Sequence, residues 1–133
     1  MKVNLPFGTD IQTLCIPEEN LLGVLMPKEV PNTLTGEAEV SRAIQSPIGT
    51  PQLRQIVQPG EKVVIVTSDI TRPMPTATVM PLLLDELYSV GIKPKDITLV
   101  FALGSHRKHT VEEKRFLAGE RAFGEVLCID GDL

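Results

Sequence analysis

The sequence lacks a long apolar run, a signal peptide and an excess of basic charge. No apolar stretch approaches the ~20 residues that a membrane-spanning helix needs, so no membrane partner is expected. The opening residues, "MKVNLPFGTD", have no apolar signal-peptide core, so the expected location is cytoplasmic. Thirteen basic and 17 acidic residues give a net charge of −4, which argues against nucleic acid as a partner.

Cysteines are also few. Only Cys15 and Cys128 are present, and each lies in an apolar "LCI" triplet. These surroundings favour two buried free thiols over a disulfide or a metal-binding pair. A length of 133 residues, with 42% hydrophobic and 23% charged residues, is typical of a globular protein with one core. We therefore expect a single domain over residues 1–133.

The first half of the chain predicts a hairpin followed by irregular segments and one helix. Residues 2–5 and 10–16 have the pattern of strands, and "PFGT" between them is typical of a turn. A short apolar run ends at Pro27. Residues 37–45 place apolar side chains at helical spacing with acids in the first turn, and a loop rich in proline and glycine follows.

The second half alternates between strands and helices. Strands are predicted at 62–67, 96–102 and 124–130, and the first is a β-branched run typical of a strand covered on both faces. Between the first two strands, "TATVMPLLLDELYSVG" predicts a helix that closes at Gly91 and buries a stripe of four side chains, Val79, Leu83, Leu87 and Val90. Pro81 requires that this helix either begins near Val79 or is kinked.

A second helix is predicted between the last two strands. "TVEE" forms a capping box, in which Thr110 caps the helix start and Glu113 reaches back, and the helix ends near Gly119. The strand–helix–strand–helix–strand order predicts right-handed crossovers and parallel strands. The expected fold is α/β: a Rossmann-like parallel sheet with flanking helices, preceded by an N-terminal β-hairpin.

Two polar loops follow the predicted strands at their carboxyl ends. "SDITRP" spans residues 68–73, and "LGSHRKH" spans residues 103–109. Neighbouring parallel strands lie ~4.8 Å apart, and open α/β sheets bind ligands at this edge. We therefore expect Asp69, Arg72 and His106 to converge.

Several roles are open to the residues of the first loop. The planar guanidinium of Arg72 suits a carboxylate or a phosphate, or it pairs with Asp69 in a solvated loop. Ser68 and Asp69 either contact a ligand or form the turn by bonding their own backbone.

The second loop carries the two histidines of the chain. His106 lies just ahead of the capped helix, whose positive end, together with Arg72 and Arg107, favours a neutral imidazole able to accept a proton. His109 is interpreted as a surface neighbour, and the two histidines lack a third ligand for a metal. Gly104 allows either a sharp turn or a close approach to a ligand.

Four segments in series resemble the N-terminal domain of the nickel-dependent lactate racemase family. They are "LPFG" at 5–8, "SPIGTPQL" at 46–53, "SDITRPMP" at 68–75 and "ALGSHRKHTVEE" at 102–113. The resemblance therefore covers most of the chain, in the same order.

This resemblance implies racemisation or epimerisation of a 2-hydroxy acid. The family transfers a hydride from the substrate carbon to a tethered nickel-pincer pyridinium nucleotide, and two histidines exchange the hydroxyl proton. His106 matches the first histidine, and Arg72 matches the arginine that holds the substrate carboxylate. Ser68 and Asp69 match positions that line the cofactor side.

The same resemblance places the remaining parts of such a site beyond this chain. The second histidine, the tethering lysine and the nickel-binding histidine are all expected after Leu133, so no residue here is assigned to the metal. We expect a fragment that is inactive without the C-terminal remainder of the protein. The alternatives are a non-catalytic α/β module that binds a nucleotide or phosphate, and loops that are only turns. The particular 2-hydroxy acid and the oligomeric state are left open.

Overall fold

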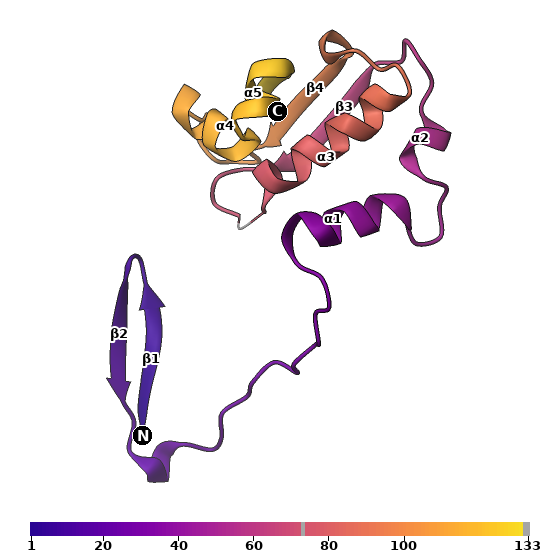
Figure 1. The fold of residues 1–133 in the computed structure, drawn as a ribbon. Coiled ribbons are helices and arrows are strands. Elements are labelled where there is room, and N and C mark those ends of the chain that lie inside the picture. The colour runs from indigo at the N-terminus through magenta and orange to yellow at the C-terminus, as the bar shows by residue number, and fades with distance from the viewer. Residues whose placement is uncertain (73, 132–133) are drawn as a thin grey trace. The chain divides into compact units, whose positions relative to one another are not determined.

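The computed structural model describes residues 1–72 and 74–131 (Figure 1). They form two compact units, residues 1–32 and residues 33–133, and each is considered by itself. The single domain predicted for residues 1–133 stays a prediction. In the part of the chain described, no helix is long and apolar enough to cross a membrane.

The first unit contains the predicted hairpin. Strands β1 (Lys2–Phe7) and β2 (Asp10–Cys15) pair antiparallel, and Gly8 takes a φ of 61° in the turn between them. A short 3-10 helix, η1 (Glu18–Asn20), follows. The prediction that Cys15 is buried is wrong, because a lone two-stranded ribbon leaves this side chain exposed.

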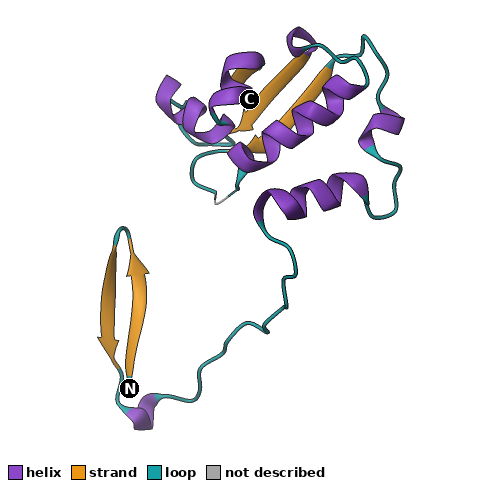
Figure 2. Ribbon diagram, in the orientation of Figure 1, coloured by secondary structure: helices purple, strands orange, loops and turns teal. Residues whose placement is uncertain are grey.

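The second unit is a three-stranded parallel sheet with helices. The order along the chain is α1 (Gly36–Gln45), α2 (Leu53–Ile56), β3 (Val63–Ser68), α3 (Thr76–Ser89), η2 (Pro94–Asp96), β4 (Ile97–Ala102), α4 (Val111–Ala118), α5 (Glu120–Glu125) and β5 (Leu127–Asp130). The strands lie in the order β3-β4-β5, and both pairings are parallel. Figure 2 shows strands in orange and helices in purple. This arrangement, with the preceding hairpin, confirms the predicted α/β fold. The short helices α2 and α5 were not predicted.

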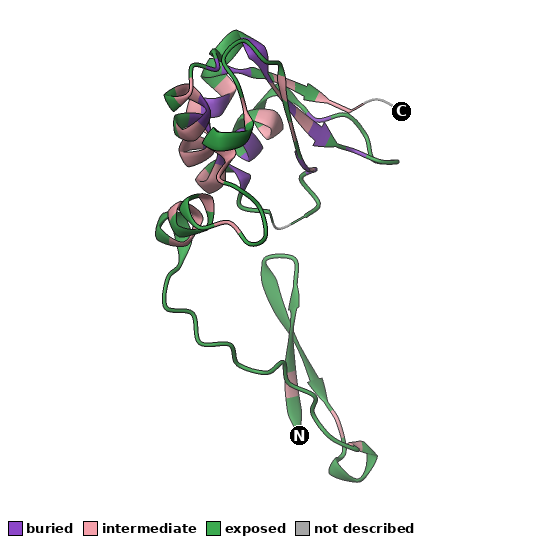
Figure 3. Cartoon of the chain, turned by 90° about the vertical axis from the view of Figure 1, so that its right-hand side faces the viewer, coloured by how far each residue is buried: buried purple, intermediate pink, exposed green. Residues whose placement is uncertain are grey.

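One face of the sheet carries the core. Buried side chains of β4 pack with those of α3, α4 and α5 in one cluster, with Leu84, Leu99 and Phe101 at 0% exposure. The buried residues of these elements are purple in Figure 3. Alternate side chains of β3 point to the opposite face, where Val64 and Val66 are 63% and 67% exposed. The prediction that β3 is covered on both faces is therefore wrong for the residues described. Cys128 is only partly buried.

Helix α3 resolves the question raised by Pro81. The helix begins at Thr76 and holds Pro81 in its interior. Its buried face consists of Thr76, Met80, Leu84 and Leu87, so it is rotated from the predicted stripe, which shares only Leu87. The end near Gly91 is confirmed, since the Gly91 and Ile92 amides donate to Tyr88 and Leu87 in a Schellman motif.

The start of α4 is as predicted. The amide of Glu113 donates to the Thr110 hydroxyl at 3.2 Å, and the Thr110 amide donates to the Glu113 carboxylate at 2.8 Å. This capping box fixes where the loop after β4 ends.

Candidate active site

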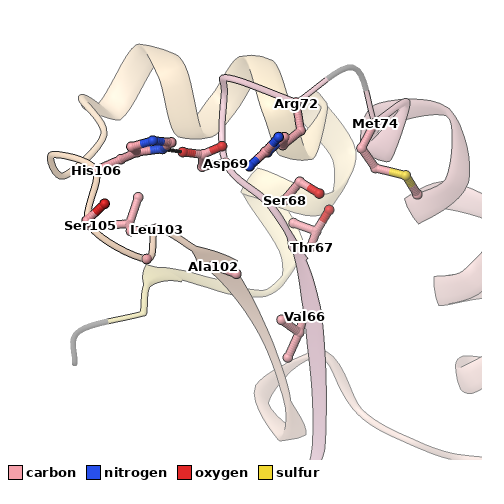
Figure 4. A pocket seen from close by; sticks show the side chains of 11 residues that line it. Val66, Thr67, Ser68, Asp69, Arg72, Met74, Ala102, Leu103, Ser105 and His106 are labelled. Atoms are coloured by element: carbon pink, nitrogen blue, oxygen red, sulfur yellow. Dashed lines mark hydrogen bonds and ion pairs between the residues drawn. The ribbon is translucent and has the colours of Figure 1, made fainter.

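The two polar loops leave the sheet side by side. Ser68 at the end of β3 is the register partner of Ala102 at the end of β4. The predicted convergence of Asp69, Arg72 and His106 is therefore confirmed. Their loops line an open hollow of about 490 Å³, called here the edge pocket (Figure 4). It is lined by Val66, Thr67, Ser68, Asp69, Arg72, Met74, Ala102, Leu103, Gly104, Ser105 and His106.

The first loop begins with a tight turn from Asp69 to Arg72. The Arg72 amide donates to the Asp69 carbonyl at 3.2 Å. The amide and the hydroxyl of Thr71 both donate to Asp69 Oδ1, at 3.2 and 2.7 Å. Asp69 therefore forms the turn through its own backbone and side chain, as one of the two interpretations of this residue predicted. It also lines the edge pocket. Pro73, the last residue of "SDITRP", lies outside the described residues.

The far end of this loop is also anchored. The hydroxyls of Thr67 in β3 and Thr76 at the start of α3 share a buried hydrogen bond of 2.6 Å. The loop that carries Arg72 is therefore fixed to the core at both ends, although Arg72 itself is exposed.

The second loop turns sharply at Gly104. This residue has a φ of 57°, a conformation that favours glycine, and the His106 amide donates to the Leu103 carbonyl at 3.0 Å. Of the two roles considered for Gly104, the structure shows the turn. The turn brings the half-exposed His106 ring toward Asp69 (Figure 4).

Asp69 and His106 form a hydrogen-bonded pair. Asp69 Oδ2 contacts His106 Nδ1, while the carboxylate is only 4% exposed. The hydrogen bond from His106, and then those from Thr71, lower the pKa of Asp69 to about 2. An ionised carboxylate only accepts hydrogen bonds, so Nδ1 carries the proton and a neutral ring keeps its lone pair on Nε2.

This pair predicts a pH dependence of stability. Because the pKa of Asp69 is lower in the folded protein than its ordinary 3.8, its stabilising contribution is present above pH ~4 and is lost as the pH falls toward 2. The difference in unfolding free energy between the wild type and Asp69→Asn should therefore shrink over that interval. Urea unfolding at steps from pH 6 to pH 2 measures it. A difference that stays constant with pH would show that the carboxylate charge contributes nothing.

Three polar side chains of the edge pocket have no partner of their own. Among residues 1–72 and 74–131, the Ser68 and Ser105 hydroxyls and the Arg72 guanidinium make no hydrogen bond or ion pair. The pairing of Arg72 with Asp69, one of the two interpretations of this residue, is therefore not found. In Figure 4 the Arg72 side chain lies on the same side of the pocket as Asp69 and Ser68. Its two-pronged donor group is available to an anion.

The surroundings of the two histidines differ from the expectation. Arg107 does not act on His106 as an uncompensated charge, because it binds the Glu113 carboxylate at 2.7 and 2.8 Å. His109 is buried, and the prediction that it lies on the surface is wrong. Its Nδ1 contacts Asp130 at 2.6 Å, because Asp130 ends β5 at the same edge of the sheet. The carboxyl ends of parallel strands meet at one edge of the sheet, and extending this rule to β5 would have predicted Asp130 near His109.

Metal binding finds no support in the side chains described. Over residues 1–72 and 74–131, no three histidine, cysteine, aspartate or glutamate side chains are placed to hold an ion. His106 and His109 are each bound to a separate carboxylate.

The fold and the edge pocket together define an α/β domain with a pocket at the carboxyl edge of a parallel sheet, the edge at which such sheets bind ligands. A comparison with known families identifies one family within that class. Residues 7–133 match the family model described as the lactate racemase N-terminal domain, and the chain belongs to this family.

Two relatives and one solved structure agree with this assignment. The lactate racemase of Thermoanaerobacterium thermosaccharolyticum is 33% identical over 120 residues, and that of Lactiplantibacillus plantarum is 33% identical over 113 residues. These alignments cover 89% and 84% of this chain but only 28% and 26% of the relatives. The chain thus spans little more than a quarter of the length of either relative.

The matching solved structures are likewise covered only in part by this chain. The T. thermosaccharolyticum lactate racemase apoprotein matches with a TM-score of 0.79 and 30% identity, over 99% of this chain and 30% of that one. A Thermotoga maritima protein matches over 72% of this chain and 21% of its own, with a TM-score of 0.56 and 24% identity, which shows a shared fold alone.

Proposed function

We propose that this chain is the active-site-bearing N-terminal part of an enzyme that racemises lactate or a similar 2-hydroxy acid. One observation carries the proposal: the Asp69–His106 pair and the unpaired guanidinium of Arg72 line the same edge pocket. A 2-hydroxy acid presents a carboxylate beside a hydroxyl, and these are the groups that an arginine and a histidine base bind. Family membership supports the same reaction.

Each residue has a role in this proposal. Arg72 binds the substrate carboxylate through two parallel hydrogen bonds and so orients the adjacent carbon. His106 Nε2 accepts the hydroxyl proton, while Asp69 holds the ring through Nδ1 and stabilises the positive charge that the ring acquires. When the substrate is re-formed, the same Nε2 can return the proton. A second acid–base group outside this chain would serve the other face of the carbon.

The lining of the edge pocket supports a place for part of a nucleotide cofactor. It combines the apolar side chains of Val66, Met74 and Leu103 with the unpaired hydroxyl of Ser68. Such a mixture suits a flat ring and its polar substituents, so Ser68 would lie against a nickel-pincer nucleotide, with Asp69 beside it. When bound, this cofactor would supply the acceptor for the substrate hydride. The side chains described do not fit the nickel ion itself.

A prediction about the metal follows. The isolated chain of 133 residues should bind no nickel tightly, because its described residues place no three histidine, cysteine, aspartate or glutamate side chains together to hold an ion. Elemental analysis of protein purified without an affinity tag, after dialysis, measures it. Stoichiometric nickel would show that ligands have been assigned to the wrong part of the enzyme.

The second candidate is a non-catalytic module that binds a nucleotide or phosphate. The unpaired donors at Ser68, Arg72 and Ser105 suit a carboxylate and a phosphate equally. The helix that follows the second loop argues against phosphate, because α4 is closed by its own capping box and has Glu112 and Glu113 in its first turn. Two acids at a helix start repel a phosphate that the free backbone amides would otherwise attract.

Racemisation itself tests the proposal. The complete protein, with its cofactor content quantified, should convert each lactate enantiomer into the other. Lactate deuterated at the reacting carbon should keep its deuterium in water, since a hydride transfer does not release that atom to solvent. Loss of the label to water would exclude the hydride route, and no conversion by fully loaded protein would exclude the proposed activity.

A further inference from the structure

We propose that His109 is a positioning residue, which holds the turn from Asp69 to Arg72 through the backbone amide of Ile70. This proposal rests on the function proposed above for Arg72 and His106. His109 Nε2 lies 3.1 Å from the Ile70 nitrogen, although 39 residues separate the two in the chain. His109 itself does not line the edge pocket.

The backbone donors of the turn show why this bond matters. The amides of Thr71 and Arg72 donate to Asp69 itself, so the turn satisfies them internally. The Ile70 amide has no acceptor within the turn and donates to His109. Partly buried amides need an acceptor, and here a side chain from the other loop supplies it. His109 thus links the loop after β3 to the loop after β4.

The protonation of the His109 ring follows from its two partners. A backbone amide can only donate, so Nε2 is the unprotonated nitrogen. Nδ1 therefore carries the hydrogen that it donates to Asp130 Oδ1 at 2.6 Å. The His109 amide donates to the second oxygen of Asp130 at 3.2 Å, and Lys114 lies 3.0 Å from that oxygen.

This arrangement is buried. The side chains of His109 and Asp130 are 1% and 5% exposed, and the His109 ring packs edge-on against Phe101 at 5.4 Å between centroids. Burial raises the pKa of Asp130, but the hydrogen bonds from His109 and Lys114 outweigh it, so the pKa is lowered overall. The carboxylate stays ionised and fixes the tautomer of His109. Asp130, at the end of β5, thus keeps His109 Nε2 unprotonated and able to accept the hydrogen bond from the Ile70 amide.

Ile70 lies next to Asp69, which holds His106, and two residues before Arg72. Releasing the Ile70 amide would therefore misplace both the base and the carboxylate-binding group. A small displacement of such groups can lower turnover by up to ~100-fold. A residue that only stabilised the fold would leave the kinetics of the folded protein unchanged.

Two conservative variants separate these roles. The amide of glutamine reaches the position of Nε2, so His109→Gln keeps an acceptor for Ile70. The amide of asparagine reaches only the position of Nδ1, so His109→Asn keeps the donor to Asp130 and loses that acceptor. In the complete, cofactor-loaded protein, His109→Asn should lower kcat/KM by ~10- to 100-fold, while His109→Gln stays within a few-fold of the wild type. Equal kinetics in the two folded variants would overturn the proposal.

Nuclear magnetic resonance gives a readout that does not depend on activity. In the wild-type protein, His109 should show an unprotonated Nε2 with a nitrogen–nitrogen coupling across the hydrogen bond to Ile70. A protonated Nε2 without that coupling would overturn the proposal even if neither variant folds. If the loaded wild type does not racemise lactate, the proposed function fails. The coupling would still show whether His109 holds the turn.

Discussion

Replacing His106 by alanine in the complete, cofactor-loaded protein should lower turnover by ~10²- to 10⁴-fold, the usual contribution of a positioned acid–base group. The fold should survive, since the His106 side chain is 46% exposed and lies outside the buried core. Both directions of the reaction should slow, because each enantiomer needs one group to accept a proton and another to donate it. Turnover of each enantiomer is measured separately, with cofactor content determined in the same preparation.

Arg107→Ala provides a matched control for this variant. Arg107 is the next residue in the loop, but it points to Glu113 and does not line the edge pocket. Its loss should leave turnover near the wild-type value. Near-normal turnover of His106→Ala with full cofactor would remove His106 from the mechanism and leave it a loop histidine.

Replacing Arg72 by alanine should weaken substrate use far more than it weakens the fold. The Arg72 residue is exposed, and its side chain has no partner in the described parts of the chain, so the free energy of unfolding should hardly change. Loss of a charge-assisted contact to the substrate carboxylate costs ~1.5–3 kcal/mol, so kcat/KM should fall by ~10- to 150-fold. Steady-state kinetics and thermal unfolding of the same preparation measure the two effects.

Arg72→Lys distinguishes the charge of this residue from its shape. Lysine keeps the positive charge but cannot form two parallel hydrogen bonds to one carboxylate. It should therefore recover only part of the lost kcat/KM. If Arg72→Ala unfolds at a lower temperature yet shows normal kinetics, Arg72 is structural.

The placement of the site was predictable from the sequence because it depends on topology. Two strand patterns separated by one helix require a right-handed parallel crossover, and that crossover brings the loops after residues 68 and 102 to one edge. The Thr110–Glu113 capping box was predictable because both partners lie within one helical turn.

The partners within the site were not predictable in the same way. The carboxyl edge of the sheet brings His106 near Asp69 and His109 near Asp130, but the hydrogen bonds of these two pairs depend on side-chain directions in segments 37 and 21 residues apart. Local pattern carries no information on such directions. The exposure of Val64 and Val66 was not predictable either. A β-branched run indicates a strand, but it does not show whether one or both faces of that strand are covered in the described residues.

The central claim is that the edge pocket binds a 2-hydroxy acid between Arg72 and His106. A crystal structure of the complete protein with lactate bound tests it most directly. We expect the lactate carboxylate on the two terminal nitrogens of Arg72 and the lactate hydroxyl within hydrogen-bond distance of His106 Nε2. Lactate bound away from the carboxyl ends of β3 and β4, or bound there without contact to either side chain, would contradict the claim.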